Sequence, residues 1–242
     1  MRETRAAASE IKFLIRPSLA PQLRNWARAN LEADPHGSGP FGDEYDTASL
    51  YFDTDNRDVF ERRRSFGRAK YRIRRYGASD VVFLERKLRR PGLLIKRRTL
   101  APIDTLAELT SPDSTAWGGE WFHRRLRVRN LRPVCQVSYH RTARTLETAD
   151  GPARLTMDHQ MRVVPIDQPC FSSETPVSFF DDRTIVEIKY RVQLPVVFKR
   201  LIEEFALEPQ SASKYRLGMA ALGYAPSAQD GPALSATDAS YA

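Results

Sequence analysis

The sequence of 242 residues has only two cysteines, Cys135 and Cys170, and their spacing matches no metal site. A disulfide framework is therefore not expected, and a reducing compartment fits the composition. No stretch approaches the roughly 18 consecutive apolar residues of a membrane-spanning helix. The first ten residues, MRETRAAASE, lack the apolar segment of a signal peptide. These absences predict a cytoplasmic protein without a transmembrane segment.

The charge is unbalanced toward the positive side. Lysine and arginine number 38 against 30 acidic residues, which gives a net charge of +8 and an isoelectric point of about 9.7. Such an excess indicates an anionic partner, such as nucleic acid, a lipid surface or polyphosphate, although a basic surface without a partner would have the same composition. Most of the cations are arginines, whose rigid fork of donors suits phosphate.

Hydrophobic periodicity predicts eight strands, over residues 10–16, 45–53, 69–76, 80–88, 93–100, 132–142, 153–160 and 184–192. Helices are predicted from residue 17 to about 31, over 103–127 with a break near Ser111 and Pro112, and over 195–205 and 214–222. The predicted fold class is α+β, an eight-stranded antiparallel β-barrel with flanking and plugging helices. Residues 1–9 are expected to be a flexible leader, 10–224 a single domain, and 225–242 a disordered tail.

Charged and apolar side chains alternate along these strands. Lys70, Arg72 and Arg74 share one face of their strand, while Tyr71 and Ile73 share the other. The same alternation places further charges on one face: Glu10 and Lys12, Glu85 and Lys87, Arg154 with Asp158, and Glu187 with Lys189.

In any single strand this pattern is typical of a sheet with one face in water. Its repetition in strand after strand favours a closed sheet whose charged face lines a lumen. An anion such as a phosphate chain would offset the positive charge gathered there.

Carboxylates on the charged face are candidate metal ligands. Mg²⁺ and Mn²⁺ take oxygen ligands from one or two carboxylates together with substrate phosphates. Glu187 is the first candidate, and Glu85 and Glu10 are the others; in the alternative interpretation each carboxylate pairs with a neighbouring lysine or arginine. His140 and His159, the only histidines on strands, are interpreted as surface or structural residues.

At these positions the chain resembles the VTC domain, the polyphosphate polymerase domain of the vacuolar transporter chaperone complex, within the triphosphate tunnel metalloenzymes. The matching motifs cover roughly residues 10 to 222 and follow the family's order: 10–13 (EIKF), 49–53 (SLYFD), 71–77 (YRIRRYG), 83–87 (FLERK), 96–98 (KRR), 139–143 (YHRTA), 154–158 (RLTMD), 187–189 (EIK) and 213–215 (SKY). The chain is identified as a stand-alone, bacterial-type member.

The resemblance implies an eight-stranded tunnel with helical plugs, in which a divalent metal, Mn²⁺ or Mg²⁺, is held by Glu187. It implies that a set of cations acts on the phosphates of ATP and polyphosphate: Lys12, Arg72, Arg74, Lys87, Lys96, Arg141 and Arg154. The substrate-binding residues expected beside them are Tyr139, Lys189, Ser213 and Lys214.

The implied activity is transfer of the γ-phosphate of ATP to a growing polyphosphate chain. The wider superfamily opens with Glu-x-Glu-x-Lys, but Ala8 takes the first acidic position here, which weakens the interpretation as a simple triphosphatase. The alternatives are a triphosphate or nucleotide hydrolase in the same tunnel and a non-catalytic binder of polyphosphate or nucleic acid. Specific nucleic-acid binding is not expected, because Tyr71 faces the apolar side of its strand and offers no stacking platform.

Overall fold

A computed structural model describes residues 9–90, 93–111 and 117–226. Its sheet runs through eight antiparallel strands in the order β1-β10-β8-β7-β3-β4-β5-β6. These strands are β1 (Ser9–Ile15), β3 (Glu44–Asp53), β4 (Ala69–Tyr76), β5 (Val81–Arg90), β6 (Leu93–Pro102), β7 (Arg132–Leu146), β8 (Ala153–Pro165) and β10 (Thr184–Tyr190). Two short strands, β2 (Glu32–Ala33) and β9 (Val177–Ser178), pair with β7 and β8. The predicted fold class is confirmed.

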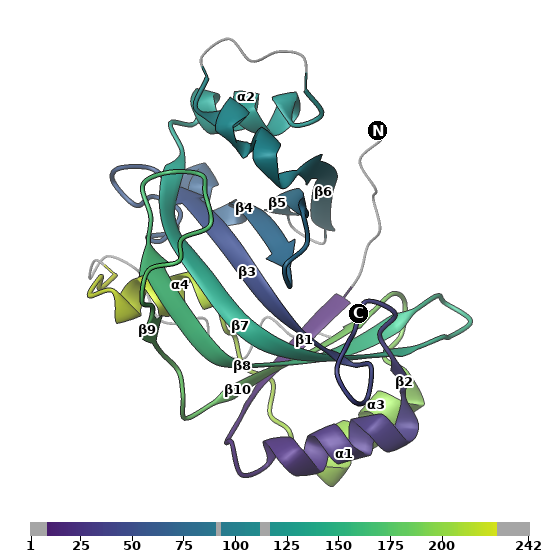
Figure 1. Ribbon diagram of the computed structural model, residues 1–242. Coiled ribbons are helices and arrows are strands. Elements are labelled where there is room, and N and C mark those ends of the chain that lie inside the picture. The colour runs from purple at the N-terminus through teal and green to yellow at the C-terminus, as the bar shows by residue number, and fades with distance from the viewer. Residues whose placement is uncertain (1–8, 91–92, 112–116, 227–242) are drawn as a thin grey trace.

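The sheet curls into a trough, and in Figure 1 its strands curve around a common concave face. Among the described residues no ladder of hydrogen bonds joins the outermost strands, β1 and β6. A side-chain contact crosses the lumen instead: Lys87 Nζ on β5 lies 3.8 Å from Glu10 Oε2 on β1. The strands thus enclose a lumen with one seam.

In the described residues, four α-helices pack around the sheet: α1 (Ala20–Asn30), α2 (Glu120–Val128), α3 (Val196–Glu204) and α4 (Lys214–Ala221). Helices α1 and α3 lie together against the outer face of β1, β10 and β8, whereas α2 lies at the opposite end of the molecule (Figure 1). Leu23 of α1 and Phe198 of α3 are fully buried there beside Phe13 of β1. The apolar faces of these strands therefore point outward beneath helices, and their charged faces point into the trough.

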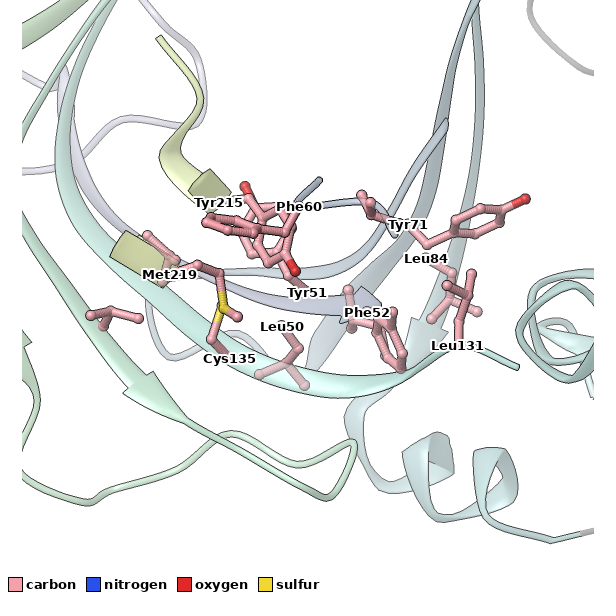
Figure 2. Packing of buried hydrophobic residues seen from close by; sticks show 14 of the residues in the cluster. Leu50, Tyr51, Phe52, Phe60, Tyr71, Leu84, Leu131, Cys135, Tyr215 and Met219 are labelled. Carbon is pink, nitrogen blue, oxygen red and sulfur yellow. The ribbon is translucent and has the colours of Figure 1, made fainter. Parts of the chain in front are cut away.

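Helix α4 packs at one end of the lumen. Tyr215 stacks on Tyr51 with ring centroids 5.2 Å apart, and Figure 2 shows Tyr215 and Met219 beside Tyr51 and Phe60. Gly218 of α4 faces Val137 so closely that an added Cβ would lie 3.0 Å from its methyl group. The small residue allows the helix to lie directly on β7. This end of the trough is thus filled by an apolar plug.

Several predicted boundaries differ from the structure. The helix predicted over 103–127 is instead a 3₁₀ segment, η2 (Ile103–Leu109), followed by α2 from Glu120. Between β3 and β4 a series of turns leads into a second 3₁₀ segment, η1 (Arg64–Arg68). The strand predicted over 153–160 continues to Pro165, because Gln160 at φ +52° bends the strand without ending it. Residues 1–8, 112–116 and 227–242, which include most of the predicted leader and tail, lie outside the described residues.

Candidate active site

One wall of the lumen is built around Glu85. Cross-strand register sets Arg72 of β4 and Arg98 of β6 on either side of it. Arg72 donates from Nε to Glu85 Oε2 at 2.7 Å, while Lys96 Nζ and Arg98 Nε lie 2.9 and 3.0 Å from Oε1. Burial alone would raise the pKa of Glu85, which is 1% exposed, but the surrounding arginines and Lys96 hold it well below its usual value. Glu85 therefore stays ionised and fixes the arginines of this wall.

The facing wall carries two buried carboxylates, Asp158 and Glu187. Arg141 forms a bidentate pair with Asp158 at 2.6 and 2.8 Å. Lys214, the first residue of α4, lies 2.6 Å from Asp158 and 3.2 Å from Glu187. Burial raises the pKa of Asp158, but Arg141 and Lys214 lower it more strongly, so that the resulting pKa is about 2. The plug helix is thus attached to this wall by one lysine between two carboxylates.

Glu10 and Glu187 form a second acidic pair on adjacent strands. Lys12 lies 3.0 Å from Glu10 and 3.3 Å from Glu187, and Lys189 lies 3.6 and 3.2 Å from them. Burial and Glu187 raise the pKa of Glu10, yet Lys87, Lys12 and Lys189 bring it down to about 2. Two carboxylates thus share two lysines.

Arginines and phenols line the end of the trough opposite the α4 plug. Arg98 Nη2 donates to the Tyr76 hydroxyl at 3.0 Å, and Arg74 Nε donates to Ser49 Oγ at 3.2 Å. Arg154 bonds the hydroxyl of Tyr45, and its Nη2 lies 2.9 Å from Asp34 Oδ2. These hydrogen bonds hold the guanidinium groups in fixed orientations around the lumen.

Positive charge exceeds negative charge on the concave face. Strand register and the position of Lys214 place eleven described cations there: Lys12, Lys70, Arg72, Arg74, Lys87, Lys96, Arg98, Arg141, Arg154, Lys189 and Lys214. The four facing strand carboxylates are Glu10, Glu85, Asp158 and Glu187. Burial lowers the pKa of Lys87 well below its usual value; Glu10 opposes this shift, while Arg72 and Lys189 add to it. Such a lumen favours a ligand with several negative charges.

The segment that begins α4 adds uncharged polar groups to this lumen. Ser213 caps the helix by accepting from the backbone N–H of Arg216, and it also accepts from Lys70 Nζ at 2.9 Å. Lys12 Nζ donates to the carbonyl oxygen of Ala212 at 3.2 Å. This segment is therefore bonded to β4 through Lys70 and to β1 through Lys12, and Lys214 connects it to β8 and β10. The N-terminus of the helix adds the positive end of its dipole to the lumen.

The fit of a divalent metal depends on Glu10 and Glu187. Within the described residues, histidine, cysteine, aspartate and glutamate form no group of three or more that could hold a metal ion alone. Mg²⁺ and Mn²⁺ commonly use only one or two carboxylates with substrate phosphates, and the adjacent pair Glu10 and Glu187 meets that requirement. All three carboxylates pair with cations, but Glu85 pairs with Arg72 and Arg98 as well as Lys96, whereas in the described residues Glu10 and Glu187 pair with lysines alone.

A comparison with family models identifies the chain. The model of the VTC domain matches residues 7–223. The chain belongs to the VTC domain family. No curated protein matches its sequence. None of the helices in the described residues is both long and apolar enough to span a membrane.

Solved structures share the fold of this VTC domain at low identity. A candidate adenylate cyclase from Bacillus halodurans superposes with a TM-score of 0.55 at 16% identity, covering 86% of this chain and 95% of its own. A candidate adenylyl cyclase from Hippeastrum, described as having a dominant triphosphatase activity, has a TM-score of 0.46 at 16% identity and covers 87% of this chain and 94% of its own. The architecture is that of the triphosphate tunnel proteins.

The structure brings the predicted residues of this VTC domain together around one lumen. They come from seven strands and from the start of α4: Glu10, Lys12, Arg72, Arg74, Glu85, Lys87, Lys96, Tyr139, Arg141, Arg154, Glu187, Lys189, Ser213 and Lys214. Tyr71 is 3% exposed within the apolar cluster on the other face of β4, as predicted. His140 and His159 have their rings on the outer side of the sheet, with centroids 5.2 Å apart. The roles of the lumen residues remain predictions.

Sequence reasoning missed two lining residues, Tyr76 and Arg98, and it placed Asp158 on the charged face without assigning it a role in the site. Tyr76 continues the series of alternate residues from Lys70 through Arg74, and Arg98 follows Lys96 by two positions, so the period of two could have found both. The role of Asp158 as partner of Arg141 depends on the β7–β8 register, which shifts at a bulge between Ser138 and His140. No local pattern of residues reveals that shift.

Proposed function

We propose that this VTC domain is a polyphosphate polymerase that transfers the γ-phosphate of ATP to a growing polyphosphate chain inside the lumen. The observation that carries the proposal is the excess of fixed cations over carboxylates on the concave face, most of them with hydrogen bonds that orient them. A polyanion of repeating charge fits such a lining better than a ligand with a single charge does.

In the proposed reaction, a terminal oxygen of the acceptor chain bonds to the γ-phosphorus while the bond from that phosphorus to the bridging oxygen of ADP breaks. The acceptor oxygen is already ionised, so the step needs no dedicated general base. Arg72, Arg74 and Arg141 hold phosphates in line and offset the charge that moves between attacking and leaving oxygens. Lys12, Lys87, Lys96 and Arg154 extend this contact along the chain, and Lys189, Ser213, Lys214 and Tyr139 bind it near the plug.

Glu187 and Glu10 would hold a Mn²⁺ or Mg²⁺ ion, with Glu85 as a further candidate. The ion supplies charge neutralisation between neighbouring phosphates when it is bound. Both carboxylates are ionised near neutral pH, because the surrounding lysines depress the pKa of each after burial has raised it. They therefore do not need to lose a proton before they can act as ligands.

The deciding experiment incubates the protein with ATP and Mn²⁺ and sizes the products on a gel. A ladder of long phosphate chains is expected. Inorganic phosphate alone would establish the hydrolase instead, and binding of polyphosphate without turnover would establish a binding module. Binding of RNA that polyphosphate does not compete away would contradict the phosphate tunnel altogether.

A double substitution tests the lumen itself. Arg72→Ala with Arg74→Ala should abolish binding of a phosphate chain, because it removes two guanidinium forks from one wall. Glu85 keeps Lys96 and Arg98, so the fold should survive. Arg75→Ala is the matched control, since Arg75 lies on the same strand but bonds the backbone of Ser79 in the turn outside. Unchanged affinity of the double variant for polyphosphate, measured by calorimetry, would contradict the proposal.

A further inference from the structure

A cavity of about 330 Å³ lies outside the lumen, between the start of α1, the bend of β8 and the loop before β10. We call it the outer cavity. It is lined by Pro17, Ala20, Pro21, Arg24, His159, Gln160, Asp181, Arg183 and Thr184. His159 follows Asp158 directly on β8, so the two side chains point to opposite faces of the sheet. In Figure 1 this region lies where α1 approaches the beginning of β10. The outer cavity is therefore separated from the lumen by the sheet.

Two buried nitrogen atoms of the outer cavity have no hydrogen-bond partner within the described part of the chain: Arg24 Nε and His159 Nδ1. Buried polar groups in folded proteins are almost always paired, so an unpaired one calls for a missing partner. Here two occur in the walls of one cavity. Because both residues line the cavity, an acceptor group bound there is the kind of partner that each of them lacks.

The charges around the outer cavity favour an acceptor that is an anion. Arg24 and Arg183 both line it, and Arg183 is paired with the neighbouring Asp182 at 3.2 Å. The carboxylate of Asp181 also lines it and limits the positive charge. Burial lowers the pKa of His159, and Arg24 and then His140 lower it further. The groups that oppose this effect, Glu44 and Asp158, are weaker. The charged groups that act on the imidazole of His159 are therefore predominantly positive.

Backbone conformation also sets this place apart. Gln160 and Phe180, which flank the cavity on β8 and on the loop, have φ values of +52° and +61°. Such conformations are costly for residues other than glycine and concentrate at functional sites. The first turn of α1, which borders the cavity, carries neither a side-chain cap nor an acidic residue in the described structure. Pro21 has no N–H and the Ala20 N–H already donates to the carbonyl oxygen of Pro17, so the helix adds the positive end of its dipole on the side of Arg24 rather than a set of free donors.

We propose that the outer cavity binds a phosphate-bearing anion, one phosphate group of which accepts hydrogen bonds from Arg24 and His159. Arg183 balances a second negative charge. The single carboxylate, Asp181, and the limited volume favour a short species, inorganic phosphate or pyrophosphate, over the interior of a long chain. This site does not depend on the reaction proposed for the lumen.

The test observes the histidine rings by NMR during a titration with sodium phosphate at constant ionic strength. The chain has four histidines, and His159→Gln assigns the resonance of interest. The experiment uses the variant with Arg72→Ala and Arg74→Ala, so that the lumen no longer competes for phosphate. We expect a saturable shift confined to His159 and its neighbour His140, together with a rise in the pKa of His159. Pyrophosphate and tripolyphosphate titrations show which phosphate species binds tightest.

Arg24→Gln should abolish the saturable shift, and Arg24→Lys, which keeps the charge but loses the Nε donor, should weaken it. Arg16→Gln is the matched control, because it removes an equal charge from an exposed position just before α1 that does not line the cavity. Circular dichroism confirms that each variant is folded. A linear shift that Arg24→Gln leaves unchanged would overturn the proposal, as would an equal saturable response to acetate.

Discussion

Tyr76 should link phosphate-chain binding to proton uptake. Burial raises the pKa of Tyr76, but Arg74 and Arg98 lower it; Glu85 opposes them, Arg141 adds a smaller lowering effect, and the resulting pKa is about 7. The structural cause is direct, since Arg98 donates to the hydroxyl and the guanidinium carbons of Arg74 and Arg98 lie 5.9 and 5.7 Å from the ring centre. The phenolate therefore supplies negative charge that the empty lumen otherwise lacks.

A bound phosphate chain takes over this role. Its charge pairs with the same arginines, so the pKa of Tyr76 should return toward the ordinary value of about 10. Tyr76 is then about half ionised in the free protein at pH 7 and about nine-tenths ionised at pH 8, and binding takes up the corresponding fraction of a proton. By linkage, this residue alone should weaken binding about five-fold between pH 7 and pH 8.

The assay is calorimetric titration with tripolyphosphate at about pH 8, in two buffers of different ionisation enthalpy, alongside phenolate absorbance in the near ultraviolet. Tyr76→Phe should lower the proton uptake by about nine-tenths of a proton per site, and Tyr190→Phe on β10, in the apolar cluster under α1 and α3, should leave it unchanged. Lys87 also takes up protons when an anion binds, because burial and Arg72 depress its pKa. The absorbance separates the two, since only a phenol contributes to it. A free protein without phenolate absorbance at pH 8, or equal uptake in Tyr76→Phe, would refute the reasoning.

Three further predictions concern the acidic pair and the plug. Glu187→Gln should remove metal-dependent turnover while leaving most of the affinity for tripolyphosphate, and unchanged turnover would exclude Glu187 as a metal ligand. Mn²⁺, followed by electron paramagnetic resonance, should bind weakly to the protein alone and more tightly once tripolyphosphate is present. Tyr215→Phe should cost about 1–3 kcal/mol in urea unfolding, because it removes the hydroxyl that bonds the fully buried Asp53; a change near zero would show that Asp53 is satisfied by its backbone donors.

The charged lumen could be predicted because its signal is local. Lys70, Arg72 and Arg74 alternate with Tyr71 and Ile73 in the sequence, and a strand converts that alternation into two faces whatever the rest of the chain does. The resemblance to the VTC domain supplied the order of the motifs. The sequence predicts α4 as a helix but not its position, since its contact with β7 depends on Gly218 meeting Val137 across eighty intervening residues.

What could not be predicted depends on segments that meet only in three dimensions. The stretch 103–127, predicted to be largely helical with a break near Ser111 and Pro112, differs only in its first part, because the apolar spacing there does not distinguish a 3₁₀ segment from an α-helix. The outer cavity joins Arg24 of α1, His159 of β8 and the loop at Asp181, and none of these neighbours another in sequence. His159 was interpreted as structural or surface, and only its unpaired Nδ1 beside Arg24 suggests a role in binding.

Glu10 and Glu187 pair with lysines in the free protein, yet the proposed reaction also requires them to bind a metal ion, and the structure suggests how both are possible. Without a ligand, Glu10 and Glu187 are neutralised by Lys12 and Lys189, which lie 3.0–3.6 Å from them. Lys87 and Lys214 also lie within 3.8 Å of one of the two carboxylates, so a dication entering this arrangement would meet four lysines at close range, and these would offset much of the attraction. A phosphate chain removes that opposition, because its oxygens can accept from the same lysines and leave the carboxylates free. The metal then gains both carboxylate and phosphate ligands, the mixed set that Mg²⁺ and Mn²⁺ prefer. Metal binding in this lumen should therefore follow the phosphate chain.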